Sequence, residues 1–132
     1  MSTTYITIIC SLLSGLIAAL VTIYVNKRSE KKRIKKELAI AIFSARHQIM
    51  YPDIRMKQDF CRAMNSIPAV FSKDKDVLIC YDQLFTALDI KDPEEKKIKS
   101  DEALLNLMKA ICKAVDIDCS DWNDSRIQRI FQ

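Results

Sequence analysis

The stretch from Tyr5 to Val25, YITIICSLLSGLIAALVTIYV, decides how this chain is organised. Its 21 residues carry no charge, and a helix of about 20 apolar residues is long enough to cross roughly 30 Å of hydrocarbon. No later apolar stretch of the chain reaches 18 residues. The sequence therefore predicts a single transmembrane helix near the N-terminus.

The charges on the two sides of this stretch predict its orientation. Met1 to Thr4 contain no basic residue, whereas a cleavable signal peptide has basic residues before its apolar core. Basic residues begin at Lys27, and loops rich in such residues stay on the cytoplasmic side. We expect an anchor over residues 1–26, a basic connector over 27–37 and a cytoplasmic helical domain over 38–132, with the N-terminus across the membrane.

Small and hydroxyl-bearing residues gather on one side of the predicted span. At 100° per residue they cover an arc of about 140°, and small residues four apart let helices approach closely in lipid. One interpretation is a monomeric anchor. The other is a homo-oligomer whose helices pack, or line a pore, along this face. The residues are Thr7, Ser11, Ser14, Gly15, Ala18, Ala19 and Thr22.

Positive charge is concentrated in the connector. Residues 27–37 carry a formal charge of +5, whereas residues 38–132 carry −1. The segment has no Gly or Pro, so we expect the membrane helix to continue through it. Its charges either face anionic lipid headgroups or form a collar that binds a nucleotide or single-stranded nucleic acid. The candidate ligand-binding residues here are Lys31, Lys32, Arg33, Lys35 and Lys36.

The rest of the chain is predicted to be all-α. One Gly and three Pro are too few turn residues for a β-sandwich of this length. Apolar residues recur at helical spacing in four stretches, and a tail from Ser120 is expected to add a short helix, which gives a compact bundle of four to five helices. The predicted boundaries are a helix end at Pro52, a helix from Pro52-Asp53 to Pro68, caps at Ser72 and Ser100, and an exposed loop over 89–99.

The sequence offers no recognisable catalytic or metal-binding pattern. It contains no Gly-rich phosphate loop, and His47 is the only histidine. The five cysteines form no C-x-x-C pair. Four of them fall within or next to apolar residues of predicted helices, which is typical of core thiols in a reducing cytosol. We therefore expect neither an enzyme, nor a metal site, nor a cofactor.

Four polar residues of the helical domain form a second candidate site. Arg46 lies close to the apolar stripe of its helix, and Asn65 precedes Ile67-Pro68. One interpretation is that Asn65 caps its helix or hydrogen-bonds the following turn. The other is that it joins a cluster that receives a phosphate or a base. The candidate residues are Arg46, Lys57, Arg62 and Asn65.

The segment from Phe43 to Leu88 resembles a family of small bacterial membrane-anchored proteins of unknown function. The residues that carry the resemblance are Phe43-Ser44-Ala45-Arg46, Ala63 to Phe71, Val77, and Tyr81 through Leu84 to Leu88. Arg46, Asn65, Ile67 and Phe71 match its pattern "Arg … Ala-x-Asn-x-Ile-x-x-x-Phe". Some such proteins are encoded beside nucleotidyltransferases in anti-phage operons. The resemblance implies a functional likeness to the membrane effector of the Hailong system, an oligomeric channel held closed by single-stranded DNA oligomers that the partner enzyme makes.

The residues and the resemblance together lead to one functional hypothesis and one alternative. The hypothesis is a homo-oligomeric effector of the bacterial inner membrane, an ion channel or membrane-disrupting protein in anti-phage defence. A nucleotide or a single-stranded DNA oligomer bound on the cytoplasmic side would gate it. The alternative is a passive membrane tether whose helical domain recruits a protein partner.

Overall fold

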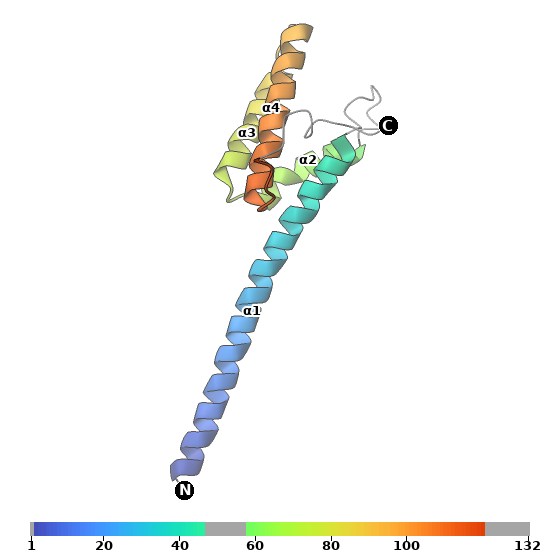
Figure 1. Cartoon of the computed structure of the whole chain (residues 1–132). Helices are drawn as coiled ribbons and strands as arrows, with labels where there is room; N and C mark the ends of the chain where they lie inside the picture. Colours follow the sequence, from blue (N-terminus) through green and yellow to red (C-terminus); the bar gives the residue numbers. More distant parts are fainter. Residues whose placement is uncertain (1, 47–57, 121–132) are drawn as a thin grey trace. The chain divides into compact units, whose positions relative to one another are not determined.

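The computed structural model of the chain describes residues 2–46 and 58–120, and all regular structure within these ranges is helical. Its helices are α1 (Ser2–Ala45), α2 (Gln58–Val70), α3 (Lys75–Leu88) and α4 (Pro93–Ala114) (Figure 1). This confirms the predicted all-α fold. The helix start expected at Pro52-Asp53 and nearly all of the tail helix expected from Ser120 lie outside the described residues.

The chain divides into two compact units, Met1–Arg33 and Ile34–Gln132. The first unit contains the greater part of α1. Its large apolar side chains between Tyr5 and Val25 are each 51% to 69% exposed, and an 18-residue window reaches a mean hydropathy of 2.5. By length and composition this helix can cross a membrane. It also continues without a break through the basic segment, as expected from the lack of Gly and Pro there.

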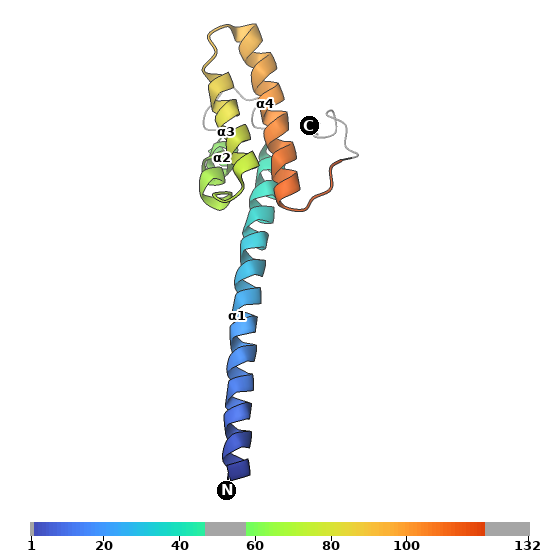
Figure 2. The same cartoon turned by 90° about the vertical axis from the view of Figure 1, so that its left-hand side faces the viewer.

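The second unit is built around a helical hairpin. Helices α3 and α4 lie side by side in both views (Figures 1 and 2) and are joined by residues 89–92. Their buried stripes include Val77 and Leu84 from α3 and Leu107 and Ile111 from α4. Helical periodicity places the residues of each pair on one side of its helix, which explains why the two stripes can meet.

The end of α1 and the whole of α2 complete this core. Ala39 and Ile42 of α1, at 0% and 1% exposure, belong to the same cluster as Ala63 and Ile67 of α2. Phe71 is fully buried where the chain leaves α2. Burying an aromatic side chain of this size contributes about 2–3 kcal/mol, so Phe71 fixes the turn that leads into α3.

Three predicted helix boundaries are wrong. The stretch 93–99 is helical rather than a loop, because α4 begins at Pro93 with Asp92 as its N-cap and Glu94 and Glu95 in its first turn. Proline suits the first helical position, where its missing N–H would have no partner, and the two carboxylates favour the helix dipole. Ser100 therefore lies inside α4, and its hydroxyl donates to the Lys97 carbonyl at 3.1 Å.

The other two corrections lie on either side of Phe71. Helix α2 continues past Pro68 to Val70, because a proline near the end of a helix removes a single backbone hydrogen bond. The Phe71 N–H then donates to the Ile67 carbonyl at 2.9 Å. The N-cap position of α3 is Asp74 rather than Ser72.

Candidate functional site

Lys35 is the basic residue of the connector that the fold holds most firmly. Its ammonium donates to the carboxylate of Asp74 at 2.6 Å, and both side chains are 25% exposed. The same ammonium lies 5.7 Å from the centre of the Phe71 ring, a cation–π distance. The carboxylate of Asp74 binds Lys35. It accepts no capping hydrogen bond from the backbone of α3, although Asp74 occupies the N-cap position of that helix. Lys35 thus ties the end of α1 to the turn between α2 and α3.

The other basic residues predicted to bind a ligand are exposed. Arg33 is paired with Glu30 one turn earlier, and the hydrogen bond from Arg33 holds the pKa of Glu30 below its usual range. Because both side chains are about half exposed or more, this pair adds little stability. Lys31, Lys32 and Lys36 are also exposed. Their side chains are accessible to an anion in solution.

Of the second predicted cluster, the structure describes Arg46, Arg62 and Asn65. Arg46 is half-buried, and its guanidinium lies 5.6 Å from the centre of the Phe43 ring. Partial burial lowers the pKa of Arg46. Arg62 and Asn65 are exposed and one turn apart on α2, so they share a face. Asn65 lies within the helix and is not its cap, whereas Lys57 lies outside the described residues.

The predicted small-residue face of α1 is exposed along its whole length. The hydroxyls of Thr7, Ser14 and Thr22 donate to the carbonyls four residues earlier at 2.8–2.9 Å. Their donors are therefore satisfied inside the helix, as required in hydrocarbon. A Cβ added at Gly15 would meet no atom within 4 Å. The fold of one chain therefore does not need a glycine there. Ser11, Ala18 and Ala19 complete this exposed face.

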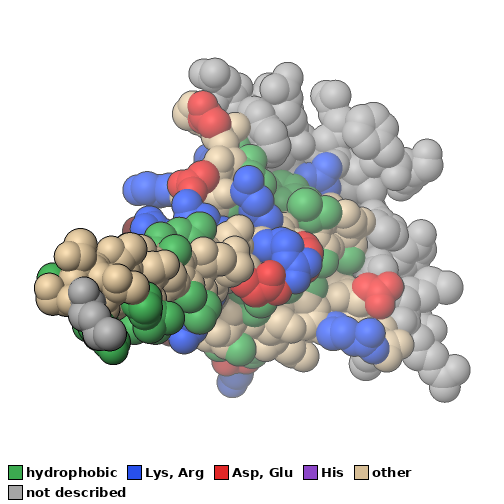
Figure 3. Space-filling view, turned by 90° about the horizontal axis from the view of Figure 1, so that it is seen from below, with side chains coloured by type: hydrophobic (Ala, Val, Ile, Leu, Met, Phe, Trp, Pro, Cys, Tyr) green, Lys and Arg blue, Asp and Glu red, His purple; other side chains and the backbone are tan. Residues whose placement is uncertain are grey.

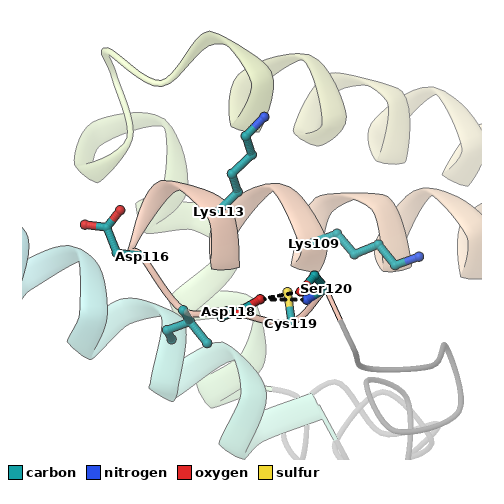
Figure 4. A pocket seen from close by; sticks show the side chains of 7 residues that line it. Lys109, Lys113, Asp116, Asp118, Cys119 and Ser120 are labelled. Atoms are coloured by element: carbon teal, nitrogen blue, oxygen red, sulfur yellow. Dashed lines mark hydrogen bonds between the residues drawn. The ribbon is translucent and has the colours of Figure 1, made fainter.

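Sequence reasoning missed a pocket at the end of α4 (Figure 4). It is open to solvent and has a volume of about 640 Å³. The carboxylate of Asp118 accepts from the backbone N–H and the hydroxyl of Ser120, at 3.0 and 2.6 Å. Both bonds lower the pKa of Asp118, and the bond from the hydroxyl has the larger effect. The pocket is lined by Lys109, Lys113, Asp116, Ile117, Asp118, Cys119 and Ser120.

A second open pocket of about 510 Å³ lies along the α3–α4 hairpin. Its lining combines polar residues, among them Gln83, Glu95 and Lys99, with the apolar side chains of Ala87, Ile90 and Ala103. On the face shown in Figure 3, Lys and Arg side chains form separate groups with Asp and Glu among them. In the sequence, positive charge is densest over residues 27–37, at a formal +5, and this connector stays the predicted anion site.

The fold and these sites define a class: a small helical protein with one N-terminal helix suited to crossing a membrane. Residues 1–131 match DUF6680, a family of unknown function, and the chain belongs to it. The match confirms the expected membership of a family without an assigned activity. No curated protein and no solved structure matches the chain.

Proposed function

We propose that this protein is a homo-oligomeric, single-pass effector of the bacterial inner membrane, gated by an anionic nucleotide-type ligand. The observation that carries the proposal is the continuity of α1. One helix of 44 residues includes the apolar stretch, the basic segment and the core residues Ala39, Ile42 and Ala45. A change in the packing of its last turns therefore acts on the same element that would enter the membrane.

The membrane location rests on exposure and charge. Apolar side chains between Tyr5 and Val25 are more than half exposed, and the hydrocarbon of a bilayer would cover them. The basic residues follow this stretch, which favours an orientation with the N-terminus in the periplasm and the helical domain in the cytoplasm.

Self-association rests on Gly15 and the satisfied hydroxyls around it. A glycine inside a helix costs about 1 kcal/mol relative to alanine, and no contact within the chain requires this one. Close approach of a second copy of the helix would use the missing side chain. An oligomer is also what a single span needs to enclose an ion pathway, so the same contact serves either packing or a channel.

Gating rests on two kinds of basic residue in the connector, the exposed lysines and the lysine that is held by Asp74. Exposed Lys31, Lys32 and Lys36 would attract the phosphates of a nucleotide or a short single-stranded DNA. Lys35 is held by Asp74, and a phosphate that competes for Lys35 would loosen the end of α1 from the α2–α3 turn. A ligand with different affinity for the held and loosened states shifts the equilibrium between them. A nucleotidyltransferase partner in anti-phage defence, as in the Hailong system, would supply such a ligand.

Native mass spectrometry of the full-length protein in mild detergent at low salt tests both self-association and binding of the nucleotide-type ligand. We expect a discrete oligomer that carries extra mass in nucleotide-sized steps. Lys31→Glu with Lys36→Glu should remove that extra mass. Lys96→Glu with Lys97→Glu, a pair of exposed residues on α4 with the same change in net charge, is the matched control and should retain it.

The possible outcomes separate the two parts of the proposal. A monomer without added mass would contradict the whole proposal. A bare oligomer of the wild-type protein would contradict the nucleotide ligand and leave self-association standing. Equal loss of mass in both charge-reversal variants would show that net charge, and not the connector, attracts the ligand.

A passive tether that recruits a protein partner is the second candidate. Exposed apolar residues on α3 favour it: Phe85 is 53% exposed, Leu88 is 45% exposed, and the Phe85 ring packs against Tyr81 with centroids 5.2 Å apart. Such a strip fits an interface core better than a solvated surface. Under this role the protein is a monomer, and reversing the charge of Lys31 and Lys36 leaves partner binding unchanged.

A further inference from the structure

The first basic residues after the apolar stretch of α1 gather on one side of the helix. At 100° per residue, Lys27, Arg28 and Lys31 fall within an arc of about 100°. Tyr24, one turn earlier, falls inside the same arc, whose middle is about 160° from the middle of the small-residue face. All four residues belong to the unit Met1–Arg33 and are exposed. We call them the basic face of α1.

The cations of the basic face have no anionic partner among the described residues. No side-chain hydrogen bond or ion pair within that part of the chain holds Lys27, Arg28 or Lys31. The nearest carboxylate in the sequence, that of Glu30, accepts from the Arg33 Nε at 3.1 Å and is paired with that guanidinium. The basic face therefore presents its positive charges to the surroundings.

The position of the basic face along α1 matches the level of lipid headgroups. The apolar stretch ends at Val25, and Tyr24 is 65% exposed. Tyrosine is enriched at membrane–water interfaces, where its ring lies in the apolar layer and its hydroxyl in the wet one. Lys27 and Lys31 follow Tyr24 by about 5 and about 10 Å along the helix axis, at 1.5 Å per residue. Their long side chains can therefore reach the phosphates of the adjoining leaflet.

The same side of α1 is apolar further towards the N-terminus. Leu13, Ile17 and Leu20 fall within the arc of the basic face, at 100° per residue, and are 53%, 61% and 58% exposed. A hydrocarbon chain can lie along these side chains while its headgroup reaches the basic face. One side of the helix thus offers apolar contact for an acyl chain and cationic contact for a phosphate.

We propose that Tyr24, Lys27, Arg28 and Lys31 bind the headgroup of an anionic phospholipid such as phosphatidylglycerol. The Arg28 guanidinium can donate two parallel hydrogen bonds to phosphodiester oxygens, the two ammonium groups add attraction to the anionic surface, and the phenol donates a further hydrogen bond. Because the basic face lies opposite the small-residue face, this site depends neither on self-association nor on the proposed nucleotide ligand.

Native mass spectrometry of the full-length protein in detergent measures the site. The protein is first treated with nuclease and washed at high salt, and then receives equal amounts of phosphatidylglycerol and phosphatidylcholine. The two lipids share the phosphodiester, but the choline cation cancels its charge. We expect phosphatidylglycerol to be retained about tenfold more often per chain. An excess of glycerol 3-phosphate should not displace it, because this soluble anion lacks the acyl chain that the apolar side of α1 contacts.

Two pairs of substitutions test whether the site is one-sided. Lys27→Gln with Lys31→Gln should lower retention of phosphatidylglycerol about thirtyfold, since each cation near an anionic headgroup contributes a factor of about five. Lys32→Gln with Lys36→Gln removes the same charge from residues outside the arc and should have a much smaller effect. Tyr24→Phe, which removes only the hydroxyl, should lower retention about fivefold.

A control for net charge and the contrary outcomes complete the test. Lys96→Gln with Lys97→Gln, at exposed positions of α4, should leave retention unchanged. Equal retention of the two lipids, displacement by glycerol 3-phosphate, or equal losses from the pairs at 27/31 and 32/36 would each overturn the lipid site. No loss in Tyr24→Phe would overturn the role given to its hydroxyl. A monomer, or a protein that binds no nucleotide, would contradict the proposed function but not this site.

Discussion

Lys35 shows at the scale of single residues how the fold changes the meaning of a charge. In sequence it is one of seven basic residues between Lys27 and Lys36. In the structure its ammonium is held by Asp74, 39 positions away, and lies near the Phe71 ring. A pattern of neighbouring charges contains no information about a partner so distant in the chain. The exposed positions of Lys31 and Lys36, by contrast, follow from their place in a helix rich in charge.

The contact between Lys35 and Asp74 leads to a prediction about stability. A double-mutant cycle of Lys35→Met and Asp74→Asn should give a coupling of about 1 kcal/mol in the free energy of unfolding, because both side chains are only a quarter exposed. Chemical denaturation of the full chain in detergent measures it. The exposed pair of Arg33 and Glu30 is the control, with a smaller coupling that salt weakens further. Equal coupling for the two pairs would contradict the assignment of Lys35 as a structural contact.

The reversal of the chain after α4 could not have been found from apolar spacing alone. Helix α4 ends at Ala114, and Asp116 adopts the left-handed conformation with φ 59°. Asp tolerates this conformation better than most residues that carry a Cβ, but the sequence contains no Gly to mark the turn.

At the scale of elements, the helices were largely predictable and their boundaries were not. The lack of Gly and Pro predicted the continuity of α1, and apolar periodicity predicted the buried stripes of α3 and α4. The charged stretch after Asp92 was interpreted as a loop because of Pro93, although Asp-Pro-Glu-Glu is also a pattern for the start of a helix. Ser72 and Asp74 are both residue types favoured at a helix N-cap. Tertiary contacts, and not the local sequence, decide which of them occupies the N-cap position of α3.

The corrected start of α4 predicts opposite effects for two alanine substitutions. Asp92→Ala should destabilise the protein by about 1 kcal/mol, because the Asp92 carboxylate accepts from the Glu94 N–H. Ser100→Ala should stabilise it by about 0.5 kcal/mol, since alanine has the higher helix propensity at an interior position. Thermal or chemical unfolding measures both. A loss of stability in Ser100→Ala similar to that of a lost cap would place the helix start at Ser100 after all.

At the scale of the whole molecule, self-association through α1 is open to a direct test. Gly15→Leu meets no steric obstacle within one chain, so the helix should form at least as well as before. We expect the population of oligomers to fall at least tenfold, because close helix packing needs the missing side chain. Analytical ultracentrifugation in detergent is the measurement. Leu13→Phe enlarges a side chain on the opposite side of the helix and should leave the oligomer intact; equal effects would contradict a specific face.

The short connection between α3 and α4 has a consequence for biosynthesis. Contacts within such a hairpin are local in sequence, and local contacts form in microseconds to milliseconds. Translation delivers roughly 5–20 residues per second, so the hairpin leaves the ribosome seconds after the apolar stretch of α1. Ala39 and Ile42 cannot reach their core partners on α3 and α4 before then. During synthesis, the N-terminal helix is therefore available to the insertion machinery well before the domain that buries its other end can fold.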